Sequence, residues 1–182
     1  MMVLNQVDPR PIPDPDNSTV YTAHTPPETF SADLLDDLDP LGGTKPSSSS
    51  VPWPGSTFII RSVDSGYVIT LLDGQIVLEP PGGRGSIHWA CVESKGWLGF
   101  QNPVSGKFLG HDRNGILYCS AVRHQGWENF CVRMRPDGGY VLLMTHFEKL
   151  WYVGSKMEQG MEKLAKVENM EPHGIVWEFV KI

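Results

Sequence analysis

The chain has 182 residues, of which 40% are hydrophobic and 10% aromatic, and it carries a formal charge of −6. This length accommodates one domain, with or without a tail, and the hydrophobic fraction is sufficient for a folded core. The acidic balance argues against a general nucleic-acid binder, and no apolar run approaches the roughly 18 residues that a membrane-spanning helix needs. With 15 prolines, 19 glycines and 6 tryptophans, the composition favours a turn-rich β protein over a helical bundle.

Residues 1–54 differ sharply in composition from the remainder. They hold ten of the 15 prolines and eight acidic residues against two basic ones, whereas residues 55–182 hold thirteen of each charge. Such a segment cannot bury enough apolar surface to offset the entropy of ordering. We therefore expect a disordered, acidic, Pro-rich tail over residues 1–54 and one folded domain over residues 55–182.

One stretch of the tail has a helical pattern. Phe30, Leu34 and Leu38 recur every four residues, which places them on one face of a short amphipathic helix near residues 31–38. A helix of this length is not stable alone. The pattern predicts a segment that folds when a protein partner binds it, and a non-functional acidic linker is the alternative.

The predicted domain divides into three pieces of similar length, residues 55–97, 98–140 and 141–182. Each piece contains an apolar run, an aromatic step, a turn dipeptide that ends in glycine, and a closing strand with a tryptophan. Alternation of apolar and polar residues indicates strands, and the repeat register favours a strand over a helix for residues 161–170. Three units of four short strands, about 42 residues each, predict an all-β fold, a single β-trefoil, with an irregular β-sandwich as the alternative.

Three tryptophans close the three pieces of the repeat. Trp89, Trp127 and Trp177 occupy corresponding positions, so all three are expected to lie in the core. Trp53 stands between two prolines ahead of the first piece, and we expect it either to fold onto the domain or to stay exposed.

Three sets of motifs in the domain have a recognisable pattern. Residues 105–115 look like the motif GKYL…dG, and residues 137–142 with 151–154 look like the motif dGrw-L…yfvG. Residues 177–182 look like a closing strand with the pattern W-x-V-x-I. These motifs resemble those of the fascin-like, actin-crosslinking β-trefoil family. The resemblance implies an intracellular binding module for a protein partner, with actin or another cytoskeletal protein as the candidate.

A second resemblance depends on one triplet, Gln125-Gly126-Trp127, which matches the QxW signature of ricin-B-type lectins, another β-trefoil family. The positions that precede Trp89 and Trp177 lack the glutamine. This partial match implies carbohydrate binding, which we keep as the alternative function.

The best polar cluster surrounds one glycine turn of the middle piece and consists of His111, Asp112, Tyr118 and Gln125. A carboxylate, an amide and an aromatic face together suit the recognition of hydroxyl groups. We predict a ligand-binding site there. The alternative is that Asp112 only shapes the turn that contains Asn114.

The sequence lacks the patterns typical of catalysis, metal binding and export. It has no nucleophile elbow, its glycine-rich stretch 82–85 lacks the Lys-Ser/Thr of a phosphate loop, and no cysteine spacing resembles a zinc site. We therefore expect no enzyme, no cofactor, no metal, and neither nucleic acid nor membrane as a partner. Three cysteines without paired spacing and an N-terminus without a signal-peptide pattern predict a cytoplasmic or nuclear protein that is not secreted.

Overall fold

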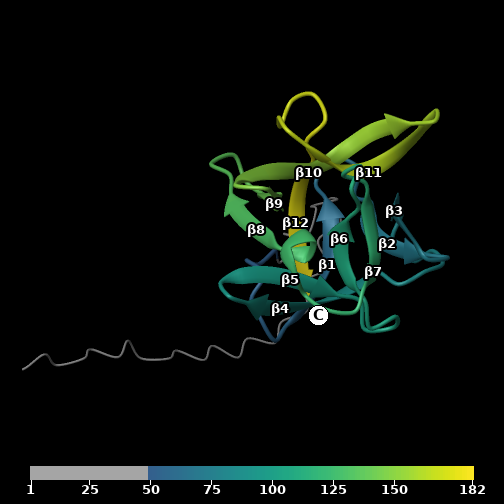
Figure 1. Cartoon of the computed structure of the whole chain (residues 1–182). Helices are drawn as coiled ribbons and strands as arrows, with labels where there is room; N and C mark the ends of the chain where they lie inside the picture. Colours follow the sequence, from purple (N-terminus) through teal and green to yellow (C-terminus); the bar gives the residue numbers. More distant parts are fainter. Residues whose placement is uncertain (1–48) are drawn as a thin grey trace, which may run out of the picture. The chain divides into compact units, whose positions relative to one another are not determined.

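The computed structural model describes residues 49–182, which form twelve strands and one turn of 3₁₀ helix (Figure 1). The described part of the chain is all-β, as predicted, and residues 161–167 form a strand, as the repeat register indicated. No helix in this part is long and apolar enough to cross a membrane. The predicted tail helix near residues 31–38, with Phe30, Leu34 and Leu38, lies outside the described residues.

Six strands pair into a closed ring. They are β1 (Thr57–Ser62), β4 (His88–Ser94), β5 (Trp97–Gln101), β8 (Phe130–Met134), β9 (Tyr140–His146) and β12 (Val176–Lys181). Each strand pairs antiparallel with the next in this order, and β12 returns to pair with β1. Closure gives every strand of the ring a neighbour on both sides, which removes the open edges that make sheets prone to aggregation.

Three further strand pairs form hairpins. They are β2 (Val68–Leu72) with β3 (Gln75–Glu79), β6 (Phe108–His111) with β7 (Leu117–Ala121), and β10 (Lys149–Glu158) with β11 (Met161–Val167). The hairpins contact one another through β3, β7 and β11. Figure 1 shows the long β10–β11 hairpin extending away from the ring. Along the chain, ring strands and hairpins therefore alternate in a regular order.

Phenylalanine rings from four ring strands fill the interior. Phe58 and Phe179 pack edge to face at 6.3 Å between centroids, and Phe100 packs on both Phe130 at 5.3 Å and Phe179 at 6.0 Å. All four are at most 1% exposed. Burial of such rings dominates core energetics, so the ring strands share one hydrophobic core.

Two tryptophans tie ring strands to hairpins. Trp89 donates its indole N–H to the carbonyl of Ile69 in β2 at 2.9 Å, and Trp177 donates to the carbonyl of Val153 in β10 at 3.2 Å. Both side chains are fully buried, as the repeat predicted. Each indole thus contributes apolar burial and satisfies a buried carbonyl at the same time.

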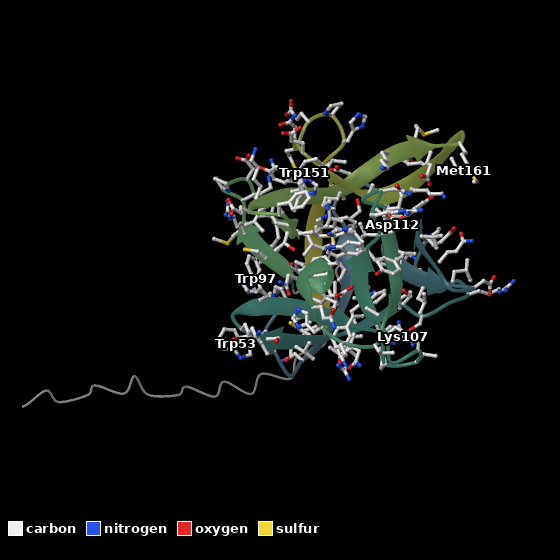
Figure 2. The ribbon with its side chains drawn as sticks, viewed as in Figure 1. Trp53, Trp97, Lys107, Asp112, Trp151 and Met161 are labelled. Carbon is white, nitrogen blue, oxygen red and sulfur yellow. The ribbon has the colours of Figure 1, made fainter. Side chains whose placement is uncertain are left out.

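Trp127 does not share this role, and the prediction that it lies in the core is wrong. Its side chain is 50% exposed, because residues 126–128 form the 3₁₀ turn η1 (Gly126–Glu128) instead of a strand. Phe130, at the start of β8, is buried among the core aromatics in its place. Trp53 is also exposed, at 72% (Figure 2).

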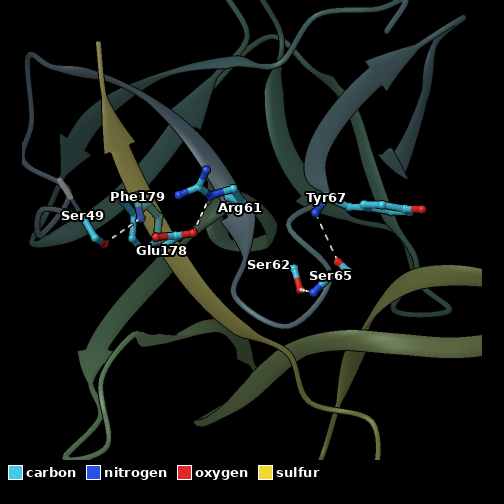
Figure 3. A network of polar contacts seen from close by, with 7 residues as sticks. All are labelled: Ser49, Arg61, Ser62, Ser65, Tyr67, Glu178 and Phe179. Carbon is cyan, nitrogen blue, oxygen red and sulfur yellow. Dashed lines mark hydrogen bonds and ion pairs between the residues drawn. The ribbon is translucent and has the colours of Figure 1, made fainter. Parts of the chain in front are cut away.

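The chain attaches to the ring before β1 begins. The backbone N–H of Ser50 donates to the carbonyl of Phe179 at 2.9 Å, and the N–H of Phe179 donates to Oγ of Ser49 at 3.3 Å (Figure 3). Arg61 of β1 and Glu178 of β12 form an ion pair on the same pair of strands. The first and last ring strands are thus held together by side chains as well as by their ladder.

The indole bonds yield the first prediction. Trp89→Phe keeps most of the buried ring but leaves the Ile69 carbonyl without its donor, which should lower the free energy of unfolding by about 1–3 kcal/mol. The same substitution at half-exposed Trp127 should change it by less than about 0.5 kcal/mol. Urea unfolding of both variants measures the two values. Equal losses at the two positions would contradict the different roles assigned to these tryptophans.

Candidate functional site

An open hollow of about 570 Å³ lies between hairpin β6–β7 and the turn η1. Tyr118 of β7 lines it together with Gln125 and Trp127, and the other lining residues are Ala121, Val122, Arg123, Gly126 and Glu128. We call this feature the Trp127 hollow. It combines an exposed indole with phenol, amide and guanidinium groups.

Trp127 is supported from below by a buried histidine. Its indole stacks on the imidazole of His111, with 5.4 Å between ring centroids and 24° between ring planes. His111 is only 4% exposed. Because one face of the indole packs on a buried ring while half of the side chain stays exposed, Trp127 presents a fixed aromatic surface to solvent.

Polar contacts hold the imidazole of His111 in place. Its Nδ1 lies 2.8 Å from the carbonyl of Asp112, and its Nε2 lies 3.3 Å from the carbonyl of Thr145 in β9. The ammonium of Lys166 in β11 lies 3.2 Å from Nε2. Burial is the main cause that lowers the pKa of His111, and the charge of Lys166 lowers it further against the two carbonyl contacts. His111 is therefore mainly neutral at pH 7.

Burial also lowers the pKa of the neighbouring Lys166, which can donate a hydrogen bond to the imidazole of His111. The carboxylate of Asp112 partly offsets this lowering of the pKa. Neutral imidazole carries one N–H, so it donates to only one of the two carbonyls and leaves its other nitrogen as an acceptor. The Lys166 ammonium is the donor within reach of that nitrogen.

Glu128 fixes the turn that carries Trp127. Its carboxylate accepts a hydrogen bond from the backbone N–H of Gln125 at 3.2 Å and closes a capping box on η1. The residue is 3% exposed, and this burial raises the pKa of Glu128 while the bond to the Gln125 backbone lowers it. Gly110 of β6 makes room for the turn, since a Cβ there would lie 2.9 Å from Oε1 of Glu128.

Asp112 is engaged in the turn between β6 and β7. Its Oδ1 accepts hydrogen bonds from the backbone N–H groups of Asn114 at 2.8 Å and Ile116 at 2.9 Å. This is an Asx-type turn, in which a carboxylate replaces a backbone acceptor. Figure 2 labels Asp112 at this hairpin.

The four residues predicted as a site are thus placed in different ways. Tyr118 and Gln125 both line the Trp127 hollow, whereas His111 lies beneath Trp127 and Asp112 caps the turn of the hairpin. Sequence reasoning missed Trp127 itself as a surface residue. The available signal was Phe130, a second aromatic that competes for the buried position three residues later.

No protein-family model and no curated protein matches the sequence. Solved structures do resemble the described fold. The ricin B-like lectin of Macrolepiota procera, solved in complex with lactose, matches with a TM-score of 0.58 at 15% identity, over 73% of this chain and 100% of that chain. The designed 3-fold symmetric protein ThreeFoil matches with a TM-score of 0.56 at 13% identity, over 69% and 99%. The described part of the chain therefore has a β-trefoil-like fold.

Other neighbours are enzymes. An exo-β-1,3-galactanase from Clostridium thermocellum matches with a TM-score of 0.59 at 20% identity, over 70% of this chain but 30% of that chain. An endo-β-galactosidase from Clostridium perfringens and a β-1,3-galactosidase are covered over 33% and 28% of their lengths. The chain thus spans about a third of each enzyme, and at these identities the likeness shows the fold alone.

These neighbours require two corrections. The prediction that the protein is not an enzyme is contradicted, because several similar structures are glycoside hydrolases. The fascin-like resemblance and its actin or other protein partner gain no support from the similar structures, which include a ricin B-like lectin. The motifs that suggested fascins specify strands and turns, so they identify the architecture shared by these families.

The buried histidine yields the second prediction. A histidine whose pKa is lowered by folding binds its proton mainly in the unfolded chain, so stability falls as the pH drops through the unfolded value near 6.5. The free energy of unfolding should therefore fall less between pH 7.5 and pH 5.5 in His111→Gln than in the wild type. Urea unfolding at the two pH values measures the difference within each variant. An unchanged pH dependence would show that folding does not shift the pKa of His111.

Proposed function

We propose that the protein binds carbohydrate and that the Trp127 hollow is the binding site. The main support for this proposal is the half-exposed indole of Trp127, which stacks on buried His111 and lines the hollow together with Tyr118 and Gln125. The indole of Trp127 lines an open hollow and is not part of the core.

The chemistry of the hollow suits a pyranose ring. A sugar has an apolar C–H face that packs on an indole and a rim of hydroxyl groups that both donate and accept hydrogen bonds. The amide of Gln125 and the phenol of Tyr118 can do both, and Arg123 supplies further donors. Because Trp127 is already stacked on His111, little side-chain entropy remains to be lost when a ligand binds.

Galactose is the sugar that the comparisons favour as a ligand class. The similar structures include a lectin with bound lactose and enzymes named as a galactanase and galactosidases. Lactose and galactans both present β-linked galactose. This agreement supports a galactose-containing glycan as the first ligand to test.

We further infer a finer organisation for the fold. Three units of about 42 residues, each with ring strands and one hairpin, would account for the regular order of elements along the chain. In this scheme the single trefoil covers residues 55–182, and the Trp127 hollow belongs to the middle unit.

Calorimetric titration of the full chain with lactose tests the proposal. The wild type should bind, and Trp127→Ala should weaken binding at least tenfold, which corresponds to about 1.4 kcal/mol. Trp53→Ala is the matched control, because Trp53 is 72% exposed and does not line the hollow, so it should bind as the wild type does. Thermal melts establish that both variants are folded.

Two outcomes would overturn the proposal. One is a wild-type protein that binds neither lactose nor other galactosides, and the other is equal binding by Trp127→Ala and the wild type. A loss of affinity in Trp53→Ala as large as that in Trp127→Ala would show that binding does not depend specifically on the Trp127 hollow.

A further inference from the structure

A second aromatic hollow lies at the turn between β9 and β10. It has a volume of about 530 Å³ and is lined by His146, Phe147, Glu148, Lys149 and Trp151. The His146 ring lies 4.1 Å from that of Trp151 and 4.9 Å from that of Phe147. We call His146, Phe147 and Trp151 the Phe147 cluster. Trp151, near the start of β10, is labelled in Figure 2.

Phe147 is an unusual residue for its position. Its side chain is 94% exposed, so it contributes almost nothing to the core. Its backbone has φ of +52°, in the left-handed region that bulky residues disfavour. Neither packing nor backbone preference accounts for a phenylalanine here.

Comparison with other tight turns of the same protein strengthens this point. Three of them also begin with a residue of positive φ, but that residue is polar and glycine follows it: Asp73-Gly74, Lys95-Gly96 and Gln159-Gly160. Such pairs are what type I′ hairpin turns favour. The β9–β10 turn instead has Phe147 followed by Glu148. Strained positions that the fold does not require concentrate at functional sites.

The Phe147 cluster adjoins the Trp127 hollow. Thr145 precedes His146 in β9, and its hydroxyl donates to the carbonyl of Gly126, next to Trp127. Beneath the surface, the Lys166 ammonium contacts both sides: it lies 3.2 Å from Nε2 of His111 and 5.7 Å from the centroid of Trp151. His111 and Lys166 thus form a continuous chain of contacts between the two indoles.

We infer that the Trp127 hollow and the Phe147 cluster are two subsites of one extended surface that binds a galactose oligosaccharide across several units. The inference rests on the proposed function, because Trp127 supplies the first subsite. Phe147 offers an exposed aromatic face to a second sugar, and Glu148 and Lys149 offer polar groups to its hydroxyls.

The test is calorimetric titration of the full chain with β-1,3-linked galactose oligomers of one to four units. Wild-type affinity should rise at least tenfold from monomer to tetramer. Phe147→Asn should lower tetramer affinity at least tenfold and monomer affinity much less. Asparagine suits the left-handed turn, so the variant should have a melting temperature equal to or above that of the wild type. If Phe147 were needed for the fold, the substitution would lower the melting temperature instead. Met161→Ala is the matched control, since Met161 is an exposed apolar residue beside another hairpin turn.

The results separate this inference from the proposed function. Wild-type affinity that is independent of oligomer length, or a Phe147→Asn variant that keeps the full gain with length, would overturn the extended surface while leaving the Trp127 site intact. Failure of the wild type to bind any oligomer would overturn both. A gain with length that Phe147→Asn abolishes and Met161→Ala preserves would support the two-subsite surface.

Discussion

The position of Phe130 in the closed ring is the constraint on which the candidate site depends. Its ring packs on Phe100 within the shared aromatic core, so the buried place at the start of β8 is filled. Trp127 lies three residues earlier and cannot enter the same space. The chain forms the η1 turn instead, with the Glu128 carboxylate buried beside Gly110, and the indole is left at the surface on top of His111.

Neighbouring elements meet beneath that indole, which makes the site a property of the folded domain and not of one hairpin. His111 comes from β6, Thr145 from β9 and Lys166 from β11, and each contacts another member of the group. Burying a lysine and a histidine costs free energy unless their polar atoms have hydrogen-bond partners. The contacts among these side chains therefore hold each of them in a defined position. The rigidity that follows is what a weakly binding ligand such as a sugar needs from its site.

The sequence was sufficient for the all-β class of the fold but not for the chemistry at the surface. Alternation and turn dipeptides are local signals, and they correctly indicated an all-β fold, the strand at 161–167 and the burial of Trp89 and Trp177. The repeat misplaced Trp127, because it could not tell which of two nearby aromatics would occupy the core. Phe147 could not be singled out from the sequence, because its unusual feature is a positive φ angle, which only the structure shows. The predicted function was inferred from motifs that specify strands and turns. Because these motifs reflect the fold and not a binding site, they led to the resemblance with fascins.

The most direct test of the central claim is a set of two-dimensional ¹⁵N–¹H spectra of the indole N–H groups during titration with lactose. The protein has 6 tryptophans, whose indole signals can be assigned by single substitutions. The account predicts that the Trp127 signal shifts in a saturable manner, while those of Trp89 and Trp177, which are bonded to carbonyls in the core, stay in place. A saturable shift of other indole signals with Trp127 unmoved, or no shift at all, would contradict it.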